Sequence, residues 1–467
     1  MTATPLLLEL GTGTLMLVVF ALGLFGPRRD RRLAGVAAAV GVFVLGAMAM
    51  FLAPSGPALG GMFVQDGLAI FAKRIFLAAT FIGLLAGLSS PQFERRSAEY
   101  HTLILASLLG MLTLASARDV ILLFLAFELM SIPLYVLTGF AKRAPETIEA
   151  SLKFFLVGSV SSAIMAYGLS FVYGATGSTR LAAIAKAPAD PWLTLGLIAV
   201  LTGIAFKIAA FPFHMWVPDA YEAASTPFVA WLSVAPKAAG FVTLFRIYFE
   251  GAGDRAAVWG PAAAGLATVT MLAGNLMALP QKNTKRLLAY SGIAQIGYML
   301  VGIAATSAAG TAMVLFYLVA YVFGNMGAFL VVEAVSRSEG SESTSAFRGL
   351  AQRSPLLALA MLLFLLSLGG IPFVAGFWAK LYVFWAAAER GLYWLVLVGA
   401  ILTVVALFYY LLIAKSMYIE PPVREGRVKV APALALSVVL CVLGIVILGV
   451  YPKSVVMAAL RVAAPLF

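Results

Sequence analysis

The segment "GIAFKIAAFPFHMW" (residues 203–216) places a lysine inside an apolar run that a proline then interrupts. No charged residue lies between Asp190 and Lys207, and Pro212 follows five residues after the lysine. A proline inside a helix removes a backbone hydrogen bond and clashes with the preceding turn, so the segment predicts a helix that breaks just after Lys207. An ionisable group in such a run is a functional-site candidate if the run crosses a membrane.

The composition of the whole chain indicates a membrane protein. Of its 467 residues, 62% are hydrophobic and 11% are charged, with a mean hydropathy of +1.00. Soluble domains contain about 25% charged residues. The net charge of +12 does not point to nucleic acid, because basic residues of membrane proteins mark their cytoplasmic loops. We therefore expect an all-α polytopic protein whose surroundings are the lipid bilayer, with no nucleic-acid partner.

The apolar runs predict about fourteen membrane-spanning helices, each of roughly 20 residues. They are expected near residues 4–26, 33–53, 67–89, 100–116, 119–139, 152–175, 192–213, 226–248, 257–279, 286–305, 310–334, 355–387, 392–418 and 431–452. Because the connections are short, residues 1–467 are expected to form a single transmembrane domain.

The distribution of basic residues predicts the orientation. Loops after odd-numbered spans contain seventeen Lys and Arg residues, whereas loops after even-numbered spans and the C-terminal segment contain eight. Six of the seventeen are Arg28, Arg29, Arg31, Arg95, Lys142 and Arg143. The positive-inside rule then places the odd loops in the cytoplasm and both termini outside, although the loop at 214–225 contains no Lys or Arg.

The remaining basic residues lie within or at the ends of predicted spans. They are Lys73, Arg74, Lys153, Lys207, Lys237, Lys380 and Lys415. A charge at the centre of a span costs at least ~2.5–3.5 kcal/mol. Lys237, in "LSVAPKAAGF", and Glu128, in "LLFLAFELMSIPLYV", lie near mid-span. These positions predict a function, with snorkelling or a purely structural ion pair as the alternatives.

Two predicted spans combine a lysine with a helix break. Lys207 precedes Pro212 in the seventh span, and Lys380 follows Gly369, Gly370 and Pro372 in the twelfth. Paired broken helices in corresponding halves of a chain are typical of inverted-repeat transporters. The five-span blocks 4–8 (about 100–248) and 9–13 (about 257–418) are the expected repeats, and an odd number of spans inverts one relative to the other.

Lysine and glutamate together predict a switchable proton carrier. Burial disfavours an ammonium group and a nearby carboxylate favours it, whereas arginine effectively never deprotonates. We expect Glu128 and Lys207 to lie within ion-pair reach. His214, after the break, is either a proton relay near neutral pH or a capping group. Lys153, near the start of its span, is either a further site residue or a snorkelling lysine.

Three ordered motifs carry a family resemblance. "FPFHMWVPDAYEAASTPFVAWLSVAPKAAG" (211–240) resembles the signature of the antiporter-like subunits of respiratory complex I and of multisubunit cation/proton antiporters. "PQKNTKRLLAYSGIAQIGYMLVGI" (280–303) and "GGIPFVAGFWAKLYVF" (369–384) resemble two further family motifs. Among the paralogues the chain looks most like the type called N in bacteria and subunit 2 in mitochondria and chloroplasts. One close paralogue carries glutamate where this chain has its span-12 lysine.

The resemblance assigns roles to residues of this sequence. It implies that Glu128 is the span-5 carboxylate, Lys207 its span-7 partner, Lys237 the central lysine and Lys380 the terminal lysine of a proton relay. Lys153 and His214 match further family positions. The chain has "EAASTP" where the family usually has "EGAPTP", and "GIPFVAGFWAK" in place of "GIPPLAGFFGK". These differences concern helix-break and packing residues and leave the ionisable ones unchanged.

The expected function is proton translocation as a membrane subunit of NADH:quinone oxidoreductase, beside other membrane and antiporter-like subunits in a bacterial cytoplasmic (inner) membrane. No cofactor is expected in this chain, because its one cysteine, Cys441, cannot hold an iron–sulfur cluster, which takes four thiolates. FMN, iron–sulfur clusters and quinone are expected in partner subunits. The alternatives are a subunit of a multisubunit Na+/H+ antiporter and a non-conducting scaffold.

Overall fold

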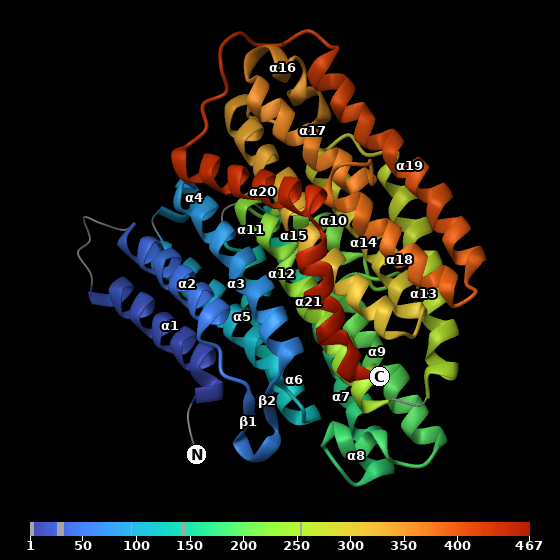
Figure 1. Ribbon diagram of the computed structural model, residues 1–467. Coiled ribbons are helices and arrows are strands. Elements are labelled where there is room, and N and C mark those ends of the chain that lie inside the picture. Colours follow the sequence, from blue (N-terminus) through green and yellow to red (C-terminus); the bar gives the residue numbers. More distant parts are fainter. Residues whose placement is uncertain (1–3, 26–31, 95, 142–144, 253–254) are drawn as a thin grey trace. The chain divides into compact units, whose positions relative to one another are not determined.

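A computed structural model describes residues 4–25, 32–94, 96–141, 145–252 and 255–467 (Figure 1). The regular secondary structure of the described chain is helical apart from a short hairpin in which strand β1 (Gly56–Ala58) pairs antiparallel with β2 (Phe63–Gln65). The predicted loop residues Arg28, Arg29, Arg31, Arg95, Lys142 and Arg143 lie outside the described residues.

The chain divides into two compact units. The first comprises residues up to 209, then 235–257 and 465–467. Its helices are η1 (Thr4–Leu6), α1 (Leu7–Phe25), α2 (Leu33–Phe51), η2 (Leu59–Gly61), α3 (Gly67–Leu88), α4 (Pro91–Glu94), α5 (Ser97–Ser116), α6 (Val120–Thr138), α7 (Pro145–Thr176), α8 (Leu181–Ala185), α9 (Pro191–Ile208), α12 (Ala235–Leu244) and the π-helix η3 (Phe245–Gly251).

The second unit comprises residues 210–234 and 258–464. Its helices are α10 (Trp216–Ala223), α11 (Thr226–Leu232), α13 (Ala256–Ala278, which begins at the unit boundary), α14 (Thr284–Ala304), α15 (Ala308–Glu339), η5 (Thr344–Phe347), α16 (Leu350–Arg353), α17 (Pro355–Gly369), α18 (Ala375–Glu389), α19 (Tyr393–Tyr418), α20 (Pro432–Val450) and α21 (Lys453–Ala463). The short helix η6 (Ala464–Leu466) begins at the end of this unit and continues into residues of the first. The inverted relation between the two predicted repeats stays a prediction.

Several long helices begin where the sequence supplies a capping side chain. Such a side chain accepts a hydrogen bond from a backbone N–H of the first turn, which would otherwise have no intrahelical partner. Asp66, Asp119, Asp190, Asn283 and Ser307 cap α3, α6, α9, α14 and α15 in this way. Local sequence therefore fixes where these spans start.

The number of spans agrees with the prediction. In the described parts of the chain, thirteen helices are long and apolar enough to cross a membrane. The predicted twelfth span, 355–387, is divided into α17 and α18, each 15 residues long. These thirteen helices and the divided span correspond to the predicted fourteen, so the all-α polytopic fold is confirmed.

Both predicted helix breaks are present. Helix α9 ends at Ile208, and Ala209 adopts the left-handed conformation with φ 66° just before the cis peptide bond Phe211–Pro212. Helix α17 ends at Gly369, and Gly370 has φ 78°, a conformation that glycine adopts without steric cost.

The predicted span 226–248 is confirmed as the segment Thr226–Gly251, but its helix is irregular. The chain forms α11, turns at Ser233 and Val234, continues as α12 and then widens into the π-helix η3. Single-turn π segments inside helices are rare and are frequent at functional sites. An 18-residue window of the segment Thr226–Gly251 is wholly buried, so most of this irregular backbone is shielded from the surroundings.

Candidate functional site

Lys207 lies in the last turn of α9 and is 2% exposed. Its Nζ lies 5.1 Å from the ring centroid of Phe127 and 5.8 Å from that of Tyr135, both on α6. Among the described residues, this ammonium has no hydrogen-bond partner. Aromatic faces attract a cation but do not replace the hydrogen bonds that water gives, so Lys207 is an ammonium without full compensation.

Glu128 follows Phe127 on α6 and is close enough to Lys207 to interact with it electrostatically. Its Oε1 accepts a 2.6 Å hydrogen bond from Ser162 Oγ on α7. The predicted ion pair was wrong for this arrangement: no carboxylate oxygen of the described chain lies within 4.0 Å of Lys207 Nζ. The Glu128 carboxylate is thus held by the Ser162 hydroxyl and interacts with Lys207 through its charge.

Lys237 lies on α12 and is 1% exposed. Three residues later, on the same face of the helix, Gly240 lets α12 approach α9 closely. A Cβ at Gly240 would lie 2.6 Å from Ile208 Cγ2 and 3.4 Å from Lys207 Cγ. The glycine thus brings the helix that carries Lys237 against the helix that carries Lys207.

Lys380 lies in the second turn of α18, in the other unit, and is 4% exposed. Its Nζ is 4.4 Å from the ring centroid of Tyr298 on α14 and has no hydrogen-bond partner among the residues described. Its stem packs on the break, because a Cβ at Gly370 would lie 2.9 Å from Lys380 Cδ. Lys207 precedes its break and Lys380 follows its own, so the two lysines do not occupy equivalent places.

The two remaining predicted residues lie in different surroundings. Lys153 is exposed on α7 and pairs with Glu149 at 2.8 Å, with 50% and 67% of the two side chains accessible. Ser162, which holds Glu128, is nine residues further on, about 13 Å along the helix. His214 is buried in the segment between α9 and α10, within the second unit, with its ring stacked on Phe211 at 5.3 Å.

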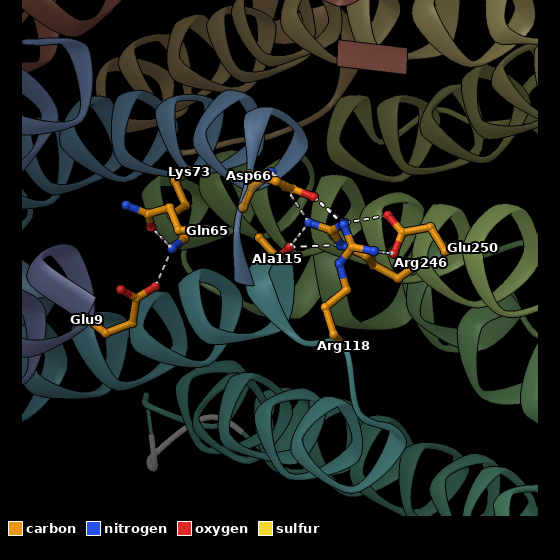
Figure 2. A network of polar contacts seen from close by, with 9 residues as sticks. Glu9, Gln65, Asp66, Lys73, Ala115, Arg118, Arg246 and Glu250 are labelled. Atoms are coloured by element: carbon orange, nitrogen blue, oxygen red, sulfur yellow. Dashed lines mark hydrogen bonds and ion pairs between the residues drawn. The ribbon is translucent and has the colours of Figure 1, made fainter. Parts of the chain in front are cut away.

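Sequence reasoning missed a network of charged residues in the first unit (Figure 2). Arg246 is one of the eight basic residues that the positive-inside count places in loops after even-numbered spans, but it is fully buried in η3. Its guanidinium donates to both carboxylate oxygens of Asp66 at 2.8 Å, to Glu250 Oε1 at 2.5 Å and to the carbonyl of Ala115. Arg118 contacts Asp66 and Glu250 at 2.5 Å each. We refer to Asp66, Arg118, Arg246 and Glu250 as the Arg246 network.

The Arg246 network holds Asp66, which caps α3, as a carboxylate. Burial alone would raise the pKa of Asp66, but the hydrogen bonds and charge of Arg246, the Ala69 N–H and the charge of Arg118 outweigh it and hold this pKa well below its usual range. The spacing of Arg246 and Glu250, four residues apart in "FRIYFEG", is the sequence signal that could have found part of the network.

A second buried pair lies beside it. Lys73 is 0% exposed, pairs with Glu9 at 2.5 Å and donates to Gln65 Oε1 at 2.5 Å (Figure 2). Its sequence neighbour Arg74 donates instead to the carbonyls of Ala49 and Met50. These contacts indicate that both residues have a structural role, joining neighbouring helices.

Comparison with known proteins places this geometry in a family. The family model described as "NADH:quinone oxidoreductase/Mrp antiporter, TM" matches residues 117–406. The NADH-quinone oxidoreductase subunit N of Moorella thermoacetica is 43% identical over 471 residues, covering 99% of this chain and 98% of that protein. Subunit N 2 of Roseiflexus castenholzii is 40% identical, covering 98% and 95% respectively.

Solved structures agree. A chain of respiratory complex I from Thermus thermophilus is 32% identical with a TM-score of 0.84, covering 97% of this chain and 99% of that one. A chain of the Mrp complex from a Dietzia species shares the fold, with a TM-score of 0.91 at 22% identity, covering 100% and 98%. The chain therefore belongs to the membrane family that NADH:quinone oxidoreductases share with Mrp antiporters, and within it to the group of NADH-quinone oxidoreductase subunit N.

Proposed function

We propose that the chain is a proton-translocating membrane subunit of an NADH:quinone oxidoreductase, in which Glu128, Lys207, Lys237 and Lys380 carry the proton. The observation that carries this proposal is the burial of the three lysines, which are 2%, 1% and 4% exposed. A buried ionisable group in a membrane span is costly and marks a proton or substrate pathway. A purely structural charge would have fixed hydrogen-bond partners, and among the described residues the ammonium groups of Lys207 and Lys380 have none.

Lysine suits this role because it can gain and lose a proton during a reaction cycle, whereas arginine effectively cannot. In the first unit, the carboxylate of Glu128 is the movable charge. Held by Ser162, it leaves the Lys207 ammonium without an ion pair. A shift of the carboxylate towards Lys207 would stabilise the ammonium, and a shift back would favour proton release towards Lys237 on the neighbouring helix α12. Each tenfold change in proton affinity requires about 1.4 kcal/mol.

Lys380 is the proposed exchange group at the end of the relay. It lies beside a helix break, where backbone groups without helical partners can bind water inside the membrane region. Lys153 and His214 remain proposed secondary positions. In the proposed relay, water joins these groups.

The surroundings follow from the same proposal. The chain would lie beside other membrane subunits, including antiporter-like ones, in a bacterial cytoplasmic membrane, with both termini outside. Redox chemistry would take place in partner subunits that hold FMN, iron–sulfur clusters and quinone. The conversion of redox energy into proton movement would then reach this chain through conformational or electrostatic change.

The test is to express the intact complex with Lys237→Ala or Glu128→Ala and to measure NADH oxidation, proton uptake in inverted vesicles and co-purification of flavin and iron–sulfur subunits. Exposed Lys429→Ala is the matched control. We expect both variants to assemble and to lose most proton uptake. Normal coupled uptake would contradict the relay, and loss of assembly would favour the scaffold. A wild-type complex without flavin subunits that exchanges Na+ for H+ would favour the antiporter.

A further inference from the structure

A cluster of uncharged polar side chains in the second unit is not used by the proposed relay. Gln295, on α14 and 1% exposed, lies at its centre. Its Nε2 donates to the carbonyl of Leu368 at 3.0 Å and to Tyr410 Oη at 3.2 Å. Its Oε1 accepts from Tyr317 Oη at 2.5 Å. Tyr410 in turn shares a 2.5 Å hydrogen bond with Ser291.

The orientation of the Gln295 amide is determined by its partners. The carbonyl of Leu368 can only accept a hydrogen bond, so the NH2 end of the amide must face it. Tyr317 then donates to the amide oxygen, and Tyr410 accepts from the NH2 group. In the hydrogen bond between Tyr410 and Ser291, either hydroxyl can donate. The amide makes three of its four possible hydrogen bonds, and no carboxylic acid could replace it in the ionised form.

The Leu368 carbonyl is one that the helix itself cannot satisfy. The last four carbonyls of a helix have no intrahelical donor. At the end of α17, Gly370 N–H donates to Ser367 O and Ile371 N–H donates to Leu366 O. Gln295 supplies a donor to Leu368 from a different helix, so α14 holds the end of α17 at the break.

The same face of α14 also holds Lys380. Tyr298 lies three residues after Gln295 and supports the Lys380 ammonium with its ring at 4.4 Å. Lys380's stem packs on Gly370, two residues after Leu368. Gln295, the helix break and Lys380 therefore form a closed set of contacts between α14, α17 and α18.

We propose that Gln295 is a positioning residue that keeps the α17–α18 break closed around Lys380. We refer to Gln295 with Tyr317, Tyr410 and the Leu368 carbonyl as the Gln295 latch. A second tie, Gly376 N–H to Ser367 Oγ at 3.0 Å, joins the two half-helices to each other but not to α14. Loss of the latch would free the end of α17 from α14 and let water reach the break and Lys380.

The latch can be tested apart from proton transport. Hydrogen–deuterium exchange of peptides covering residues 364–380 is measured in the assembled complex carrying Gln295→Leu or Tyr317→Phe. We expect about tenfold faster exchange for Gln295→Leu, from the loss of a buried hydrogen bond, and a smaller increase for Tyr317→Phe. Gln281→Leu is the matched control, because this more exposed amide donates only to the carbonyl of Met277, four residues earlier. Unchanged exchange in Gln295→Leu overturns the latch.

Gln295→Glu provides a second readout that depends on charge. A protonated carboxyl can still donate to the Leu368 carbonyl, whereas an ionised one repels it. The titratable groups around it are the phenols of Tyr317 and Tyr410 and, beyond Tyr298, Lys380. We expect coupled activity relative to wild type to be at least about threefold higher near pH 6 than near pH 8. A pH profile parallel to wild type, as expected for Gln281→Glu, contradicts the latch.

The consequence for Lys380 rests on the proposed function, and the two can fail separately. Faster exchange in Gln295→Leu together with normal proton uptake supports the latch and counts against Lys380 as a carrier. Unchanged exchange overturns the latch whatever happens to proton uptake. If Gln295→Leu does not assemble, Tyr317→Phe and Gln295→Glu give the same two readouts.

Discussion

Replacing Arg246 tests whether its network is a neutral, buried unit. The Arg246 network contains two carboxylates and two guanidinium groups, so Arg246→Met leaves it with one uncompensated negative charge. Breaking a buried ion pair by removing one partner costs about 3–5 kcal/mol. Arg118 still contacts both Asp66 and Glu250 at 2.5 Å, and Asp66 is 27% accessible. We therefore expect a loss near the lower limit, about 3 kcal/mol of unfolding free energy.

The double variant Arg246→Met with Glu250→Gln gives the sharper result. It restores neutrality, leaving Asp66 paired with Arg118, so it should be more stable than Arg246→Met alone by at least about 1 kcal/mol. Arg118→Met is the matched comparison: it leaves the same single negative charge, but its side chain is 31% accessible, so water screens part of the imbalance and the loss should be smaller than for Arg246→Met. Unfolding is followed by titrating the purified protein in mild detergent with a denaturing detergent. If the loss in the double variant equals the sum of the losses in Arg246→Met and Glu250→Gln, charge neutrality is refuted as the stabilising feature.

Three further outcomes are expected. Gly240→Ala should reduce the free energy of unfolding by about 1–3 kcal/mol and lower proton uptake, because the new Cβ would lie 2.6 Å from the stiff Ile208 side chain. Unaltered uptake would show that α12 and α9 need not stay in contact. Removing Glu128 and Lys207 in a double-mutant cycle should give a coupling of roughly 1–2 kcal/mol, less than for a direct ion pair, and strict additivity would exclude electrostatic interaction. Asp66 should stabilise the protein fully at pH values above about 4 and lose this contribution only as the pH falls through its low folded-state pKa. The difference in unfolding free energy between wild type and Asp66→Asn should therefore stay constant between about pH 5 and 8.

The spans and breaks could be predicted because they depend on local chemistry. An apolar run of sufficient length, an aspartate that caps a first turn, or Pro212 and Gly370 at a helix end act on their own neighbours. The turn at Ser233 and Val234 also has a local cause, because Pro236 cannot donate to the carbonyl of Leu232 and its ring crowds that carbonyl. By contrast, the widening of η3 around Arg246 has no local cause that composition reveals.

The site was predicted only in part because side-chain pairing is not local. Arg246 and Asp66 are 180 residues apart in sequence, so a position near the end of an apolar run was read as a loop charge. An ion pair between Glu128 and Lys207 was expected because both are ionisable. The hydroxyl of Ser162, which binds Glu128 instead, carries no charge and could not be singled out from the sequence. Gln295 was likewise unremarked within its motif, since its role depends on a carbonyl 73 residues away.

The most direct test of the central claim, that a buried lysine carries the proton, compares Lys380→Arg with Lys380→Glu in the assembled complex. Arginine keeps the charge but effectively never deprotonates, whereas glutamate keeps a titratable group. Proton uptake per NADH oxidised is measured in inverted vesicles, normalised to assembled complex. We expect Lys380→Arg to lose more coupled uptake than Lys380→Glu. Near-normal uptake with arginine and none with glutamate would show that Lys380 is a fixed electrostatic anchor and would contradict the proposed relay.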